Sequence, residues 1–246
     1  GRVPLTGGPG LLVGIAVPLL VLDLPLAAGA VAAVAGFFAV GLVDDFLALR
    51  PAPKFALQGG VALTAGFLLV PPAHAAFAGL VFLFLVNASN YLDNMDALLP
   101  GVALTQAVTL LFFTVFGVSG APLLVWALPA MVFLTVPPAR VYLGDSGSHL
   151  VGALLAVDAV GLLYGPEGVE PRYLFPLAVL FAVPAADVAT VTISRLRRGR
   201  PVFRGGLDHL SHRLVRAGFP VPRAVLVLVL ASGVCGAASL LLLHSS

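Results

Sequence analysis

The chain has 246 residues, of which 60% are hydrophobic and only 10% are charged, and its mean hydropathy is +1.08. Soluble domains carry about 25% charged residues, so the composition excludes a large soluble globule and indicates an integral membrane protein. The net charge of +2 gives no basic field for a nucleic acid, which we do not expect as a partner, and the single cysteine, Cys235, excludes a disulfide framework.

Apolar runs between proline, glycine and charge clusters predict nine membrane-spanning helices. A helix that crosses the roughly 30 Å hydrocarbon layer needs about 20 mainly apolar residues, and several of these runs are somewhat shorter. No repeat or long linker divides the chain, so we interpret residues 1–246 as one all-α domain, a polytopic membrane helical bundle. The predicted spans are 8–22, 26–43, 55–70, 76–92, 101–117, 121–138, 148–164, 173–193 and 223–243.

The basic residues orient this bundle. With nine spans, every one of the 13 lysines and arginines except Arg172 falls on the same side of the membrane. The positive-inside rule makes that side cytoplasmic, so the N-terminus is predicted inside and the C-terminus outside. Four polar segments lie on the cytoplasmic side, near 44–54, 87–100, 137–148 and 194–222.

The first polar segment holds Asp44 and Asp45 at the end of the second span, followed by Lys54. Neighbouring side chains on a helix diverge by about 100°, so the two carboxylates face different partners. We expect one to face the reacting groups and the other a metal or a basic partner. The plain alternative is a solvated helix end.

The second polar segment spaces Asn87, Asn90, Asp93 and Asp96 three residues apart at the end of the fourth span. Residues three apart share a helix face, but repeated steps of three drift around the helix and would put Asn87 and Asp96 on opposite sides. We therefore expect the helix to tighten or unwind near Asp93–Asp96, before Pro100. A simple turn is the alternative, because Asn and Asp are good turn formers.

The third and fourth segments add an acid and a basic group. The sequence GDSGS (144–148) puts Asp145 at a helix N-terminus, where free N–H groups favour a phosphate; an ordinary N-cap turn is the alternative. In DHLSHR (208–213), His209, His212 and Arg213 suggest a cationic phosphate clamp, or else an amphipathic segment on anionic lipid. Zinc is not expected, because further His or Cys ligands are lacking.

Several ionised acids on one side of a membrane repel one another unless they surround a cation. The sequence therefore predicts a divalent metal site on the cytoplasmic side. Mg²⁺ suits such a site, because it is held by one or two carboxylates, water and substrate phosphates. The candidate acids are Asp44, Asp45, Asp93, Asp96 and Asp145.

These segments, in this order, resemble those of the polyprenyl-phosphate N-acetylhexosamine-1-phosphate transferases, which include undecaprenyl-phosphate N-acetylglucosamine-1-phosphate transferase and phospho-N-acetylmuramoyl-pentapeptide transferase. The likeness covers essentially the whole chain, and the family usually has ten or eleven helices, so we expect this chain to lack the first. The matching positions are Asp44, Asp45, Lys54, Gln58, Asn87, Asn90, Asp93, Asp96, Gly144–Ser148, Pro184, Asp187, His209 and His212. The departures are Asn94 and Ala97 in place of glycine, Thr135 in place of asparagine and Ser211 in place of histidine.

The resemblance implies that a polyprenyl phosphate attacks the β-phosphate of a UDP-N-acetylhexosamine, giving a polyprenyl-diphospho-sugar and UMP with Mg²⁺ or Mn²⁺. Asp145 would be a metal ligand, with Asp93 or Asp96, while Asp44 or Asp45 would orient or deprotonate the lipid phosphate. Substrate-binding residues would be Asn87, Asn90, which contacts the nucleotide or supports the site, and the phosphate clamp of Lys54, His209, His212 and Arg213.

The resemblance also implies a multi-pass protein of the bacterial inner membrane, embedded in the lipid bilayer, with its active site on the cytoplasmic face. UDP-N-acetylglucosamine is the expected donor, because the three consecutive histidines typical of the peptidoglycan enzyme are missing; that enzyme and an inactive scaffold stay as alternatives. A cation-coupled transporter is disfavoured, since only Asp158 lies mid-span. A homodimer is left open.

Overall fold

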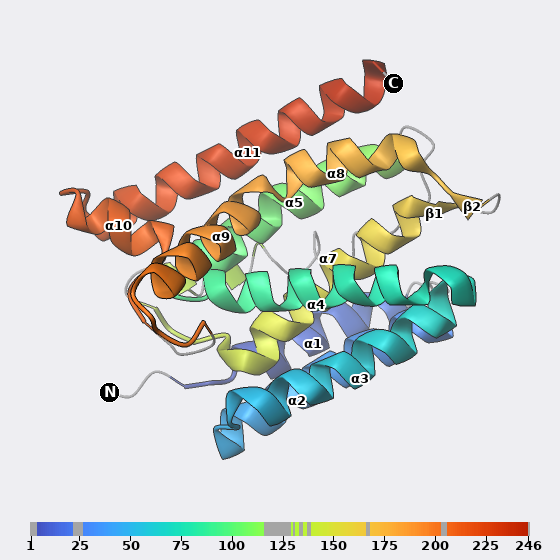
Figure 1. Cartoon of the computed structure of the whole chain (residues 1–246), viewed down its shortest axis with the longest axis horizontal. Coiled ribbons are helices and arrows are strands. Elements are labelled where there is room, and N and C mark those ends of the chain that lie inside the picture. The colour runs from blue at the N-terminus through green and yellow to red at the C-terminus, as the bar shows by residue number, and fades with distance from the viewer. Residues whose placement is uncertain are drawn as a thin grey trace.

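The computed structural model describes residues 4–21, 27–115, 129, 131–132, 135–136, 139–165, 168–202 and 206–245, which form a helical bundle (Figure 1). Its α-helices are α1 (Gly7–Val21), α2 (Ala28–Leu47), α3 (Pro51–Leu69), α4 (Ala75–Leu92), α5 (Leu98–Val115), α7 (Gly144–Leu163), α8 (Leu174–Leu180), α9 (Ala182–Arg197), α10 (Leu210–Arg216) and α11 (Val221–Ser245). The shorter elements are the 3₁₀ turns η1 (Pro72–His74) and η2 (Pro171–Tyr173) and the two-residue antiparallel strands β1 (Tyr164–Gly165) and β2 (Gly168–Val169).

Helix α7 is the centre of the bundle. Its apolar residues are distributed around all of its sides, as expected of a helix enclosed by others, and 89% of its most apolar stretch is buried. Helices α1, α2 and α4 pack directly against it, while α3 packs on α2 and α4 and α11 packs on α5 and α8. The helices that flank α7 therefore determine which side chains surround its first turn.

Four described helices are long and apolar enough to cross a membrane: Ala28–Leu47, Pro72–Leu92, Gly144–Leu163 and Val221–His244. The pair α8 and α9 makes a fifth if the two are counted as one span, and α1 and α5 contain shorter apolar helices. Eight of the nine predicted runs overlap described helices, whereas the sixth, 121–138, lies almost wholly outside the described residues. The helical membrane class is confirmed, and the number nine stays a prediction.

The predicted span over 173–193 is a bent pair of helices rather than one straight helix. The chain forms α8 and α9, which are bent by 65° at Phe181. Pro184, in the first turn of α9, has no N–H to donate to the carbonyl of Leu180, so the helical hydrogen-bond ladder is interrupted at this point.

The polar motifs gather at one end of the bundle. The C-terminal ends of α2, α4 and α9 and the first residues of α3, α5 and α7 lie at the same end of the bundle as α10, at the left of Figure 1, while β1 and β2 lie at the right. Helix α1 is tied to this end because Gly7 N–H donates to the carbonyl of Tyr142 (3.0 Å) and Gly8 N–H to that of Leu143 (3.1 Å).

Helices α4 and α7 touch through a glycine. A Cβ added at Gly152 would lie 2.5 Å from Val86 Cα and 2.7 Å from the carbonyl oxygen of Leu85. Both are backbone atoms and cannot move aside as a flexible side chain can. Gly152 thus sets the distance between α7, which carries Asp145 in its first turn, and α4, which carries Asn90.

We predict that Gly152→Ala destabilises the protein by about 1–3 kcal/mol, the usual cost of overpacking. The matched control is Gly59→Ala, on α3, where an added Cβ meets nothing within 4 Å. That change should be neutral or stabilising by up to about 1 kcal/mol, since alanine is the better helix former. Melting temperatures in detergent test the pair, and equal values for the two variants would contradict the close α4–α7 contact.

Candidate active site

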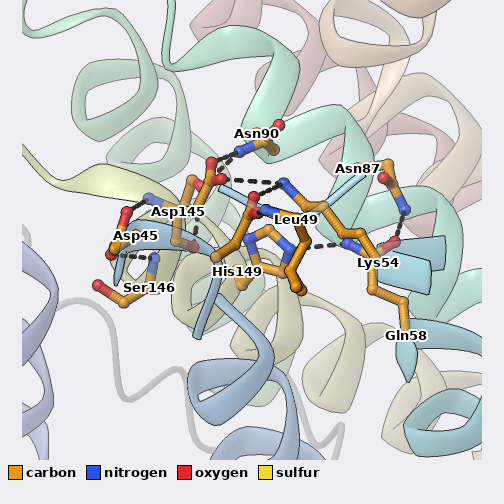
Figure 2. A network of polar contacts seen from close by, with 11 residues as sticks. Asp45, Leu49, Lys54, Gln58, Asn87, Asn90, Asp145, Ser146 and His149 are labelled. Carbon is orange, nitrogen blue, oxygen red and sulfur yellow. Dashed lines mark hydrogen bonds and ion pairs between the residues drawn. The ribbon is translucent and has the colours of Figure 1, made fainter. Parts of the chain in front are cut away.

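Asp145, in the first turn of α7, is the centre of a polar network (Figure 2). The Nζ of Lys54 lies 3.0 Å from its Oδ2, and the amide of Asn90 donates a short hydrogen bond to its Oδ1. Asn90 also donates to the hydroxyl of Ser148 (3.0 Å). One carboxylate therefore joins α3, α4 and α7.

Lys54 bridges two carboxylates. Its Nζ lies 2.7 Å from Asp44 Oδ2 as well as 3.0 Å from Asp145 Oδ2. Asp44 also accepts the N–H of Leu49 (2.6 Å) through Oδ1. Because neighbouring side chains on a helix diverge, we predicted that one acid of the Asp44–Asp45 pair faces a metal or a basic partner. Asp44 faces such a basic partner, Lys54.

Asp45 points to a different partner. Its carboxylate accepts the N–H groups of Asp145 (2.7 Å) and Ser146 (3.0 Å), so an acid on α2 caps the N-terminus of α7. Gly144 has φ +68°, and an added Cβ would lie 2.8 Å from Asp45 Oδ1, so the position requires glycine. The expectation that a phosphate binds these N–H groups is corrected, because Asp45 already occupies both.

Helix α4 ends where the spacing of its polar residues predicted. Leu92 is its last residue, Asp93 lies at the C-cap, and α5 begins at Leu98. Ala97 closes the turn with φ +62°, a left-handed conformation that favours glycine. This turn brings Asp93 and Asp96 beside the start of α7.

Four carboxylates line one cavity of about 670 Å³: Asp45, Asp93, Asp96 and Asp145. Asn90 and Thr135 also line it, and the hydroxyl of Thr135 donates to the carbonyl of Met131, four residues earlier (2.7 Å). Burial raises the pKa of Asp93 to about 7, and the charges of Asp145, Asp45 and Asp96 add to the effect. The cavity therefore holds more negative charge than its own basic residues offset.

These oxygen donors suit a hard cation such as Mg²⁺. Among the residues that the structure describes, no group of three or more acidic, histidine or cysteine side chains is arranged for coordination. This is compatible with Mg²⁺, which needs only one or two carboxylates when water and substrate phosphates complete its shell. The oxygen donors of the cavity fit the ion, and the assignment of Asp145 and Asp93 as its ligands stays a prediction.

The predicted basic clamp has a different arrangement. Asp187, 1% exposed, accepts the N–H of Leu210 (2.7 Å) and lies 2.8 Å from His209 Nδ1. The ring of His209 meets Tyr91 edge-on at 5.5 Å. Asn87, the remaining predicted binding residue, donates to Gln58 (3.0 Å) and to the carbonyl of Leu83 (2.8 Å). These side chains are engaged inside the protein, so their part in substrate binding stays a prediction.

His212 and Arg213 also lie outside the carboxylate cavity. Burial lowers the pKa of His212, and the charges of His209 and Arg216 lower it further, so its part in a cationic clamp stays a prediction. Arg213 donates to the carbonyl of Asp208 (3.2 Å). Ser211 is fully buried and donates to Asn94 (2.5 Å), which fastens α10 to the turn after α4.

Sequence reasoning missed a second, basic cavity of about 530 Å³. Its lining includes Arg195, Arg198, Arg200 and Arg216, with Asp208 as the acid. The guanidinium of Arg195 lies 5.8 Å from the ring centre of Tyr91. Tyr91 and Asn90 line a further cavity, so this contact lies between that cavity and the basic one. The run 195–200 gave a signal, but it indicated membrane orientation as readily as a binding site.

The chain is similar in sequence to a known family of enzymes. Residues 27–162 match the model of glycosyl transferase family 4. The chain is 30% identical to decaprenyl-phosphate N-acetylglucosaminephosphotransferase of Mycobacterium tuberculosis, with 87% of this chain and 62% of that protein covered. It is also 29% identical to phospho-N-acetylmuramoyl-pentapeptide-transferase of Deinococcus radiodurans (82% and 70% covered) and 26% identical to undecaprenyl-phosphate alpha-N-acetylglucosaminyl 1-phosphate transferase of Yersinia pestis (94% and 71%).

The capping contact gives a prediction about Asp45. Asp45→Ala removes the acceptor for two N–H groups of α7 and should destabilise the protein by about 1–2 kcal/mol. The matched control is Asp96→Ala, which removes an acid of the same cavity that makes no hydrogen bond to any described residue and should melt within about 0.5 kcal/mol of the wild type. If both variants melt like the wild type in detergent, Asp45 is not a cap.

Proposed function

Because the chain belongs to glycosyl transferase family 4, we propose that it transfers N-acetylhexosamine-1-phosphate from a UDP-sugar to a polyprenyl phosphate and releases UMP. The chain spans 62% of the length of the Mycobacterium relative, so its activity and substrates are inferred rather than carried over. The observation that supports the proposal is the cavity where Asp45, Asp93, Asp96 and Asp145 meet at the charged end of the bundle.

We propose UDP-N-acetylglucosamine as the donor. Both the Mycobacterium and Yersinia relatives are named for N-acetylglucosamine transfer. The second candidate is phospho-N-acetylmuramoyl-pentapeptide transfer, because the Deinococcus relative carries that name. Either product would serve the synthesis of a bacterial cell-wall or surface glycan.

Mg²⁺, or Mn²⁺, is the proposed cofactor, with Asp93 and Asp145 as the residues that would hold it. When bound, such an ion polarises phosphoryl oxygens and offsets the charge that develops on a leaving phosphate. The excess of carboxylates around Asp93 supports this assignment, since an ion of charge +2 would stabilise their ionised forms.

The chain's own residues would position the reactants. An oxygen of the polyprenyl phosphate attacks the β-phosphorus of the donor, the bond from that phosphorus to the α-phosphate oxygen breaks, and UMP leaves with the electron pair. The second pKa of a phosphate ester is about 6, so the attacking oxygen is ionised at pH 7 without a general base. Lys54, held by Asp44, would offset negative charge beside Asp145, and Asn90 would fix the Asp145 carboxylate.

An apolar cavity of about 390 Å³ suits the prenyl chain of the acceptor. It lies between the first half of α4, the end of α7 and the α8–α9 pair, toward the end of the bundle opposite the carboxylates, and Phe77, Phe84, Leu163, Leu174 and Phe181 are among its lining residues. Such a lining solvates a hydrocarbon chain but offers nothing to a nucleotide. We propose that the two substrates therefore reach the carboxylates from different directions, one from the bilayer and one from water.

The proposal includes the membrane arrangement. The chain would cross the bacterial inner membrane nine times, with the carboxylate cavity on the cytoplasmic side where sugar nucleotides are made. The gathering of Asp45, Asp93, Lys54 and Asp145 at one end of the bundle supports a single reaction face. A homodimer stays an open proposal.

The activity is tested by UMP release from a panel of UDP-sugars in membranes supplied with undecaprenyl phosphate, with and without Mg²⁺. We expect the highest rate with UDP-N-acetylglucosamine and a loss of at least about 100-fold in Asp145→Asn, which keeps a hydrogen-bonding side chain of the same shape. The control Glu170→Gln removes an acid at the opposite end of the bundle, where Glu170 pairs with Arg172, and should leave the rate unchanged. Wild-type membranes that release no UMP from any donor would contradict the proposal.

The raised pKa of Asp93 predicts how pH and metal act together. Its folded pKa of about 7 exceeds the unfolded value of 3.8, so its contribution to stability is complete below about pH 4 and is lost as pH rises through 7. Mg²⁺ binds the ionised carboxylate and should raise the melting temperature more at pH 8 than at pH 6. Asp93→Asn should remove this difference, and an equal Mg²⁺ effect at both pH values would count against Asp93 as a ligand.

A further inference from the structure

A second polar layer lies beneath the Lys54–Asn90–Asp145 network. Gln58 is four residues from Lys54 on α3, and His149 is four residues from Asp145 on α7. Asn87 is three residues from Asn90 on α4. Each member of the second layer therefore sits about one helical turn from a member of the first, on the same three helices, as Figure 2 shows.

The hydrogen bonds of the second layer determine the role of each atom. Asn87 uses its amide nitrogen to donate both to the carbonyl of Leu83 (2.8 Å) and to Oε1 of Gln58 (3.0 Å). The amide oxygen of Gln58 is thus the acceptor, and its nitrogen, 2.7 Å from His149 Nε2, is the donor. His149 Nε2 must then carry a lone pair, which places the proton of the neutral ring on Nδ1, a buried atom that meets no hydrogen-bond partner among the described residues.

This layer is deeply buried. Gln58 is 1% exposed and His149 is fully buried, whereas the Asp145 side chain above them is 30% exposed. A buried amide that loses its partner costs free energy, so the layer tolerates only those helix rotations that keep all of its hydrogen bonds. An apolar side chain at 149 would allow more rotations of α7 against α3.

We propose that His149 is a positioning residue that, through Gln58 and Asn87, fixes α3, α4 and α7 in the rotation that places Lys54 and Asn90 on Asp145. The inference deepens the proposed function, because it concerns the geometry of the same reaction site. His149 itself contacts no substrate in this account. It acts on the reaction through the hydrogen bond from Gln58.

The first test compares His149→Leu with His149→Gln in the full chain. Leucine removes the acceptor, so Lys54 and Asn90 lose their fixed positions and kcat should fall about 10- to 100-fold, while KM for the UDP-sugar changes less than about threefold. Glutamine can place an amide oxygen near the former Nε2 position and should recover most of kcat. A glutamine variant as slow as the leucine variant, or a leucine variant with normal kcat, would overturn the proposal.

A matched control separates positioning from general loss of stability. Val160→Ala removes buried side-chain volume near the other end of α7, where Val160 is 1% exposed, and should lower the melting temperature without lowering kcat. If Val160→Ala reduces kcat as much as His149→Leu at a similar melting temperature, the effect of His149 is only structural and the proposal fails.

The second test does not depend on activity. In protein with ¹⁵N-labelled histidine, the ring signals of His149, identified by their loss in His149→Gln, should show a neutral ring with hydrogen on Nδ1 and none on Nε2. A proton on Nε2 would overturn the proposal, because Gln58 could not then donate to it. This measurement holds even if every UDP-sugar fails as a donor, so failure of the proposed function and failure of the positioning layer are told apart.

Discussion

The carboxylate of Asp145 is the constraint on which the arrangement of the helices depends. An ionised group at the end of an apolar bundle is stable only when charged and polar partners surround it, and here they come from α3 and α4, through Lys54 and Asn90. Helix α2 adds Asp45 as a cap on the same turn, and the glycine contact at Gly152 lets α4 approach α7 closely. The ends of α2 and α4 and the start of α3 therefore meet at one place, where the buried helix α7 begins.

At this end of the bundle, the carboxylates outnumber the basic side chains that pair with them. Lys54 is shared by Asp44 and Asp145, and the N–H groups at the start of α7 are taken by Asp45. Asp93 and Asp96 enter the same cavity, and the pKa of Asp93 rises because burial and its acidic neighbours disfavour its charge. A divalent cation, with a diphosphate to complete its shell, would resolve the imbalance, and membership in glycosyl transferase family 4 supports that chemistry for this chain.

Much of this could be predicted from the sequence, because composition, spacing and charge asymmetry are local properties. They indicated a helical membrane bundle, the end of α4 near Asp93, and acids gathered on one side. They could not indicate which partner each acid takes, since Asp45 reaches the N–H groups of Asp145 and Ser146 only through the rotation of α2 against α7. The bend at Phe181 was not predicted, although Pro184 follows it closely, because residues 173–193 form one mainly apolar run.

The most direct test of the central claim is the ³¹P hyperfine coupling of Mn²⁺ bound to the protein together with UDP. If Asp93 and Asp145 hold the ion against a diphosphate, the wild-type complex should show the strong coupling of a directly coordinated phosphate, and Asp145→Asn should lose it. Coupling that persists unchanged in Asp145→Asn, or bound Mn²⁺ with no phosphorus near it in the wild type, would contradict the account.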